Sequence, residues 1–140
     1  MKIMHFHADG HYAQIFVQPL VDCERKSGHL SDIYVDQNCT IEQKSAKFNL
    51  EIRRMFSLLI FLYKLVALLR KNQPDIIIAH NTRSSLIPLI AGALARVKLR
   101  IYFNHGVPFL GYRGLLKYLL ALLEALNISF STNVITVSTD

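Results

Sequence analysis

The chain has 140 residues, of which 51% are hydrophobic and 19% are charged, and its formal net charge is +6. This length suits one domain with a buried core, and the apolar content excludes an intrinsically disordered protein. The basic excess indicates anionic partners such as phosphates, nucleotides, acidic lipids or nucleic acids, without selecting among them.

Strand and helix signals alternate along the whole chain. In chain order, the sequence predicts a strand at 2–6, a helix at 16–26, a strand at 33–35, a polar loop at 36–46, a helix at about 50–71, a strand at 75–79, a helix at about 86–97, a strand at 100–104, a helix at about 114–128 and a strand at 133–137. Pro19 and Pro88 fall in first turns, and Gly28 and Pro74 mark helix ends. The alternation predicts the α/β class: a doubly wound, parallel, Rossmann-like sheet between two helical layers, α/β/α.

Two features bear on the cell compartment. The longest apolar run in the long helix, Met55 to Tyr63, is interrupted by Lys64 and is shorter than the roughly 20 residues of a membrane span, so a buried or surface-lying helix is expected. Cys23 and Cys39 fit no metal-ligand spacing, and no secretory signal is visible, which predicts reduced thiols in a cytoplasmic protein.

The alternation also predicts where ligands bind. In open α/β sheets they bind outside the carboxyl ends of the strands. The loops expected at that edge are 7–11, 80–85, 105–112 and the residues from Ser138 onward, and the first three contain four of the six histidines.

Three segments resemble glycosyltransferases of family 4. Residues 73–81 (QPDIIIAHN) are similar to the family's PDIVHAHN segment, residues 100–109 (RIYFNHGVPF) to its strand followed by His-Gly, and residues 133–138 (NVITVS) to the strand ending in Ser that closes its N-terminal domain. The order and spacing of the segments match as well. Two positions depart from the family pattern: Gln18 stands where Arg is usual, and Asp9-Gly10 stands where many relatives carry Gly-Gly.

The resemblance implies that residues 1–140 are the N-terminal, acceptor-side domain of a GT-B enzyme, with the C-terminal donor-binding domain absent. It implies a retaining transfer from a nucleotide-sugar donor to a saccharide acceptor, often lipid-linked, in bacterial capsule or other polysaccharide biosynthesis. The chain alone is expected to be inactive. Peripheral contact with the inner face of the plasma membrane is also expected.

His105 is the main candidate catalytic residue. It follows a strand and precedes Gly106, and in relatives the matching His faces the donor sugar; the alternative is a histidine satisfied by local backbone. Gly106, Asp9 and Gly10 are candidate donor-binding residues, and simple turns are the alternative.

A second group of polar residues is predicted to bind the acceptor. His80, Asn81, Thr82 and Arg83 precede a helix, whose positive end favours phosphate, and helix capping is the alternative. Tyr112 and Arg113 lie in a glycine-flanked loop suited to stacking on a sugar or pairing with a diphosphate, and a solvated loop tip is the alternative.

No metal or cofactor is expected. His5 and His7 face the same side of the first strand, but with His11 they lack a completing ligand set. Basic residues on two apolar helices suit either an anionic membrane or a solvated face: Arg53, Arg54, Lys64, Arg70, Lys71 and Lys117. No segment resembles a nucleic-acid recognition module.

Two other functions stay open. The chain is also compatible with one subunit of a two-chain glycosyltransferase, or with a non-catalytic Rossmann-like domain that binds a small phosphate ligand. The absence of a G-x-G-x-x-G fingerprint and of a P-loop argues against dinucleotide and NTPase forms of the latter.

Overall fold

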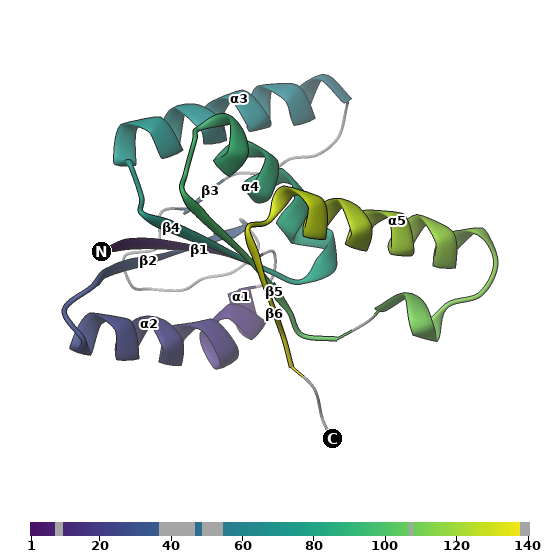
Figure 1. Ribbon diagram of the computed structural model, residues 1–140, viewed down its shortest axis with the longest axis horizontal. Coiled ribbons are helices and arrows are strands. Elements are labelled where there is room, and N and C mark those ends of the chain that lie inside the picture. Colours follow the sequence, from purple (N-terminus) through teal and green to yellow (C-terminus); the bar gives the residue numbers. More distant parts are fainter. Residues whose placement is uncertain (8–9, 37–46, 49–54, 107, 138–140) are drawn as a thin grey trace.

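The computed structural model describes residues 1–7, 10–36, 47–48, 55–106 and 108–137 (Figure 1). It contains a six-stranded sheet in the order β3-β2-β1-β4-β5-β6, in which every neighbouring pair is parallel. The strands are β1 (Lys2–His7), β2 (Leu30–Asp36), β3 (Lys47–Phe48), β4 (Ile76–His80), β5 (Leu99–Asn104) and β6 (Asn133–Thr136). The predicted parallel, doubly wound sheet is confirmed, and β3 is a short strand that the sequence did not reveal.

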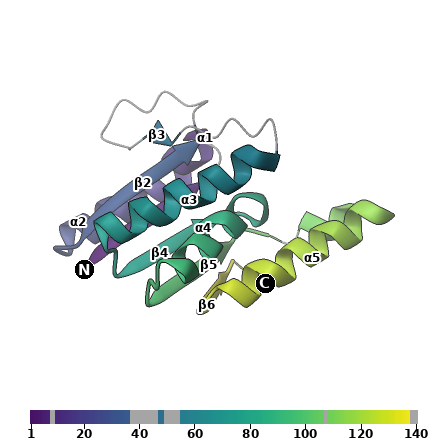
Figure 2. The same ribbon diagram turned by 90° about the horizontal axis from the view of Figure 1, so that it is seen from above.

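Helical segments cover both faces of the sheet unevenly. One face carries a continuous helical segment made of α1 (Gly10–Tyr12), the π-helical η1 (Ala13–Val17) and α2 (Gln18–Lys26). On the opposite face α3 (Met55–Asn72), α4 (Thr82–Leu94) and α5 (Leu115–Phe130) lie side by side (Figure 2). A short 3-10 helix, η2 (Pro108–Gly111), precedes α5.

The sheet reverses its winding between β1 and β4. From β1 the chain moves outward to β2, whereas from β4 it moves the other way to β5 and β6. Loops that leave two such adjacent strands diverge, and the crevice between them is the usual ligand position in doubly wound sheets. The fold therefore predicts a site beyond the carboxyl ends of β1, β4 and β5.

Apolar packing holds these strand ends in place. A cluster that includes Met4, Phe6, Leu65 and Ile77 lies between the sheet and α3 and α4. On the other face, a cluster of five buried residues packs the η1–α2 segment onto β2. Its members are Ala13, Val17, Val21, Ile33 and Val35. Because both faces of β1 are packed, its polar side chains are held in fixed positions.

Two helices begin earlier than the sequence indicated. The first helical segment starts at Gly10 instead of residue 16, and α4 starts at Thr82 instead of about residue 86. Pro88 is therefore inside α4 and not in its first turn. Pro88 is buried, and a proline cannot donate the helical hydrogen bond at that position.

The buried face of helix α3 differs from the one expected from its sequence, in which Leu59 and Tyr63 belong to the apolar face. Leu65 and Leu69 are buried against the sheet, whereas Leu59 and Tyr63 are exposed. Within the described part of the chain, no helix combines the length and the hydropathy needed to cross a bilayer.

Candidate functional site

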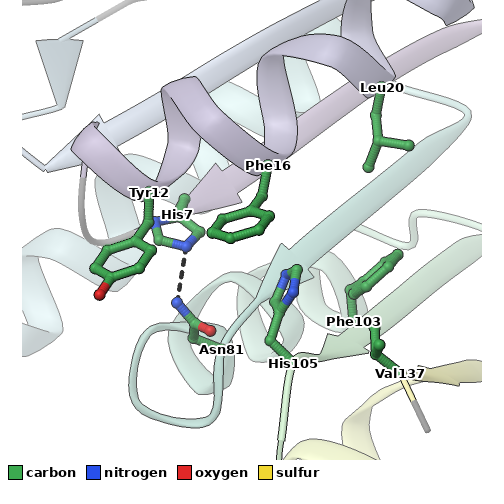
Figure 3. A pocket seen from close by; sticks show the side chains of 8 residues that line it. All are labelled: His7, Tyr12, Phe16, Leu20, Asn81, Phe103, His105 and Val137. Atoms are coloured by element: carbon green, nitrogen blue, oxygen red, sulfur yellow. Dashed lines mark hydrogen bonds between the residues drawn. The ribbon is translucent and has the colours of Figure 1, made fainter. Parts of the chain in front are cut away.

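A pocket of about 570 Å³ lies at the predicted edge of the sheet (Figure 3). It is lined by His7 at the end of β1, Asn81 after β4, Phe103 and His105 at the end of β5, Val137 after β6, and Tyr12, Phe16 and Leu20 from the helical segment. Its volume is in the range of small-ligand sites. The lining is mostly apolar with a few polar groups, which is the usual composition of a site that orients an organic ligand.

One side of the pocket is an aromatic and aliphatic stripe. Tyr12, Phe16 and Leu20 are spaced four residues apart, so they project from one face of the continuous helical segment. The Tyr12 and Phe16 rings are stacked with centroids 6.0 Å apart. All three side chains are exposed in the described chain, and they offer apolar faces to a ligand.

His105 faces this stripe from the end of β5. Its ring lies 4.7 Å from the ring of Phe103 and 6.0 Å from that of Phe16, between centroids. Partial desolvation by these neighbours lowers the pKa of His105, so the ring is neutral at physiological pH. His105 is thus placed to exchange a neutral hydrogen bond with a ligand.

Gly106 gives the backbone its turn after His105. Its φ of +155° is unfavourable for residues with a side chain, and its N–H donates to the Asn104 side-chain oxygen at 2.9 Å. A Cβ at this position would meet open space. The requirement for glycine is therefore conformational.

Behind His105, two buried histidine side chains extend the row of rings from the pocket into the interior of the protein. His80 Nδ1 lies 3.2 Å from His105 Nε2, and His5 Nδ1 lies 3.2 Å from His80 Nε2. His5 Nε2 in turn lies 2.9 Å from Oε2 of Glu24 on α2. We call His5, His80 and His105 the imidazole row.

The two inner rings of the imidazole row are uncharged. Burial, together with the neighbouring imidazoles, lowers the pKa of His80 to about 2. Burial also lowers the pKa of His5, and the hydrogen bond and charge of Glu24 oppose that shift in part. Both side chains are fully buried, so His80 does not reach the pocket surface itself.

Asn81 is held in a strained conformation at the pocket. Its φ of 69° and ψ of 145° lie in a region that residues other than glycine rarely adopt. Its side-chain Nδ2 donates to His7 Nε2 at 2.7 Å. Backbone strain of this kind concentrates at functional sites.

The other residues predicted around α4 have different positions. Thr82 is buried on the far side of the sheet, where its hydroxyl contacts that of Tyr102 at 3.0 Å. The capping alternative is wrong, because α4 begins without a side-chain cap. Ser84 and Ser85 instead donate to the carbonyl oxygens of His80 and Asn81.

The remaining predicted residues do not line the pocket. Arg83 donates to the Tyr112 hydroxyl at 3.4 Å on the exposed surface, and Arg113 is exposed beside them. Gly10 is buried at the start of α1. Asp9 lies outside the described residues.

Sequence reasoning missed two groups of functional side chains. The pocket stripe was missed because residues 7–11 were expected to form a loop, so Tyr12 and Phe16 were not placed on one helix face. Glu24 and His5 were missed because their contact depends on packing of α2 over β1. The sequence signal that could have pointed to His5 was the face of the first strand that it shares with His7.

Among the described residues, no group of three or more His, Cys, Asp or Glu side chains is arranged to hold a metal ion.

Solved structures with the same fold include two epimerases and a glycosyltransferase. The UDP-GlcNAc 2-epimerase from Methanocaldococcus jannaschii matches with a TM-score of 0.75 and 14% identity over 99% of this chain and 40% of that one. The epimerase from Neisseria meningitidis bound to UDP-GlcNAc matches with a TM-score of 0.66 and 15% identity, over 97% of this chain and 40% of that one. The glycosyltransferase VinC in complex with dTDP matches with a TM-score of 0.54 and 13% identity, over 98% and 49%.

At these identities the similarity establishes the fold, and the chain spans less than half the length of each of these proteins. No curated protein matches the sequence. The sequence model of Glycosyltransferase Family 4, however, matches residues 3–140, nearly the whole chain. Together with the doubly wound sheet and the pocket at its carboxyl edge, this match shows that the chain belongs to Glycosyltransferase Family 4.

Proposed function

We propose that this chain is the N-terminal, acceptor-side domain of a retaining GT-B glycosyltransferase. The whole enzyme transfers a sugar from a nucleotide donor to a saccharide acceptor, lipid-linked in the biological reaction, during bacterial polysaccharide synthesis. The observation that carries the proposal is the placement of a neutral His105 opposite an exposed aromatic stripe, in a pocket at the reversal point of a family 4 domain.

The pocket chemistry suits a sugar. Tyr12 and Phe16 present ring faces on which the apolar face of a sugar ring packs, while His105 and Asn81 offer hydrogen-bonding groups to its hydroxyls. The N-terminal end of α4 begins directly after Asn81, and its partial positive charge favours a phosphate nearby. A sugar attached to a diphosphate combines both requirements.

The compared structures guide the choice of donor. The epimerase from Neisseria meningitidis is bound to UDP-GlcNAc, and VinC is bound to dTDP. UDP- and dTDP-sugars are therefore the first donors to test. In the proposed enzyme the donor nucleotide contacts mainly the second lobe, and the domain described here holds the acceptor and the sugar end of the donor.

The proposal is tested by substituting His105 in the enzyme that contains this domain. We expect His105→Ala to lower kcat by roughly 10- to 100-fold, the loss of one hydrogen bond of about 1–3 kcal/mol in the transition state. Transfer of labelled sugar from the donor to a saccharide acceptor is the measurement. His29→Ala, outside the pocket, is the matched control. Equal kcat values for His105→Ala and His29→Ala would contradict the proposal.

The proposed division between two lobes gives a second test. The 140-residue chain alone is expected to show no turnover of a nucleotide sugar, because it supplies only one side of the reaction site. Sustained product formation by the purified chain would show that the two-lobe proposal is wrong.

We also propose that α5 contacts the cytoplasmic face of an anionic membrane, where a lipid-linked acceptor is found. The first half of α5 exposes large apolar side chains around its circumference, namely Leu115, Leu116, Tyr118, Leu119 and Leu122. The exposed Lys117 lies among them, and the exposed Arg113 precedes the helix by two residues. Apolar side chains interspersed with cations are the composition of helices that rest on anionic bilayers.

A further inference from the structure

The imidazole row has a consistent direction. Glu24 Oε2 contacts His5 Nε2, His5 Nδ1 contacts His80 Nε2, and His80 Nδ1 contacts His105 Nε2. Each ring therefore uses Nε2 toward Glu24, and the two inner rings use Nδ1 toward the pocket. Three residues from β1, β4 and the end of β5 are joined in this way to a fourth on α2.

The carboxylate end fixes which nitrogen of each ring carries the proton. An ionised carboxylate only accepts hydrogen bonds, and Glu24 Oε2 also accepts one from the Ser31 hydroxyl at 2.6 Å. His5 must then donate from Nε2. A neutral imidazole has one donor and one acceptor, so His5 Nδ1 is an acceptor and His80 must donate to it from Nε2. The same step at His80 makes its Nδ1 the acceptor of a proton on His105 Nε2.

We propose that Glu24, His5 and His80 are positioning residues that hold His105 in the Nε2–H tautomer. Nδ1 of His105 is then kept as a hydrogen-bond acceptor for the ligand in the pocket. A free imidazole exchanges between two tautomers, whereas His105 is bonded to a ring whose own tautomer is fixed by a carboxylate. The hydrogen bond that fixes a ring also sets which nitrogen meets the substrate.

This assignment narrows the ligand group that His105 contacts. A neutral ring with a bare Nδ1 accepts a hydrogen bond from a hydroxyl, but it cannot donate one from that atom to a phosphate oxygen. The inference rests on the proposed function for its catalytic meaning, since it assigns His105 to a sugar hydroxyl. The tautomer itself is a property of the free domain and is measured without any substrate.

The test is to record the ring-nitrogen chemical shifts of the 140-residue chain by long-range ¹H–¹⁵N NMR at neutral pH. Protonated and bare ring nitrogens have well-separated shifts, and loss of the signals in His105→Phe assigns that ring. In the wild-type chain we expect His5, His80 and His105 each to show a protonated Nε2 and a bare Nδ1. A protonated Nδ1 on His80 or His105 would overturn the proposal.

Substitution of Glu24 tests whether its carboxylate fixes the tautomers of the three rings. In Glu24→Ala the acceptor is lost, and we expect His80 and His105 to show the averaged shifts of mixed tautomers. Asp22→Ala is the matched control: it removes a carboxylate from the exposed surface of the same helix, where Asp22 accepts a bond from Gln18, and should leave all three rings unchanged.

If His80 and His105 each keep a single Nε2–H tautomer in Glu24→Ala, Glu24 does not fix the tautomers of the imidazole row. His80→Phe provides a second variant, because it keeps a ring of similar shape while separating His105 from the carboxylate, and it should also give mixed tautomers at His105. If neither variant folds, the wild-type shifts alone still decide the proposal. The NMR result and the transfer assay can fail independently, so a failed tautomer prediction is distinguishable from a failed function.

Discussion

Asn81 has a backbone conformation that favours glycine and a side chain that bonds to His7. The strained φ and ψ cost of order 1–3 kcal/mol. Both Asn81→Ala and Asn81→Gly lose the 2.7 Å bond to His7, but only glycine relieves the strain.

We expect Asn81→Gly to be more stable than Asn81→Ala by about 1 kcal/mol, after the greater chain entropy of unfolded glycine is subtracted from the relieved strain. Urea unfolding of the two variants is the measurement. An alanine variant as stable as the glycine variant would show that the conformation at residue 81 is not strained.

The buried histidines make folding stability depend on pH. Their pKa values are lowered in the folded chain, so the unfolded chain binds more protons at mildly acidic pH. The stability they contribute is complete above the unfolded value of about 6.5. This contribution to stability is lost as the pH falls toward the lower pKa values that the histidines have in the folded chain. Each such histidine reduces the free energy of unfolding by up to about 1.4 kcal/mol per pH unit in that window.

We expect the free energy of unfolding to fall less steeply between pH 6.5 and 4 in His80→Phe than in the wild type. Urea unfolding at several pH values measures the slope. His29→Gln, outside the imidazole row, should keep the wild-type slope. If His80→Phe also keeps it, His80 is not buried in its neutral form.

At the level of residues, the sequence identified the pocket only in part. His105 and Asn81 were predicted because parallel strands place their carboxyl ends at one edge, and that rule needs no tertiary detail. Thr82 was assigned to the same site, but the start of α4 carries it to the other face of the sheet. Glu24 was not identified, since no sequence spacing predicts that α2 brings it to His5.

Helix α5 is attached to the sheet by a buried polar contact as well as by apolar packing. Glu124 accepts hydrogen bonds from the Tyr102 hydroxyl at 2.8 Å and from Asn104 Nδ2 at 2.5 Å, and it is buried. Because burial raises the pKa of Tyr102, its hydroxyl remains a donor. If Glu124 is removed, Asn104 Nδ2 loses its acceptor, and the Tyr102 hydroxyl keeps only its contact with Thr82.

We therefore expect Glu124→Ala to lower the free energy of unfolding by about 2–4 kcal/mol, since unsatisfied buried donors cost about 1–3 kcal/mol each. Tyr102→Phe should lower the free energy of unfolding less than Glu124→Ala does, because it removes the hydroxyl donor itself and leaves no donor at residue 102 that needs Glu124 as its acceptor. The exposed Lys117→Ala on the same helix is the control and should be nearly neutral. The double variant Tyr102→Phe/Glu124→Ala tests whether the two residues are coupled. If its loss of unfolding free energy equals the sum of the losses in the two single variants, Tyr102 and Glu124 are not coupled.

At the level of elements, the sequence predicted nearly every strand and helix, because hydrophobic periodicity is local. The exceptions were the short strand β3 and the helix starts. Residues 80–85 are polar and resemble a turn, but Ser84 and Ser85 bond to carbonyl groups of the preceding turn and join α4. Serine hydroxyls satisfy either a loop or a helix, so composition alone does not place such a boundary.

The whole molecule has an apolar surface on α5 that lies away from the pocket stripe. The proposed membrane contact follows from this surface and from the net charge of +6. Attraction to anionic lipid adds to burial of the apolar side chains, so binding should depend on both lipid charge and salt.

We expect the chain to sediment with phosphatidylglycerol vesicles and much less with phosphatidylcholine vesicles. Leu119→Glu should weaken binding by about tenfold or more, the loss of one buried leucine. Leu94→Glu is the matched control, because Leu94 on α4 is as exposed as Leu119, at 51% against 53%. Equal weakening by both variants would argue against a contact made by α5.

The two sides of the pocket differ in how freely they tolerate substitution. His7, Phe103 and His105 come from strand ends that are fixed by the sheet, whereas Tyr12, Phe16 and Leu20 project from a helical segment whose core contacts are made by other residues, such as Val17 and Val21. Exchanges among these three positions leave the core intact. If the proposed sugar site is correct, a library restricted to residues 12, 16 and 20 should alter sugar selectivity while the imidazole row is left unchanged.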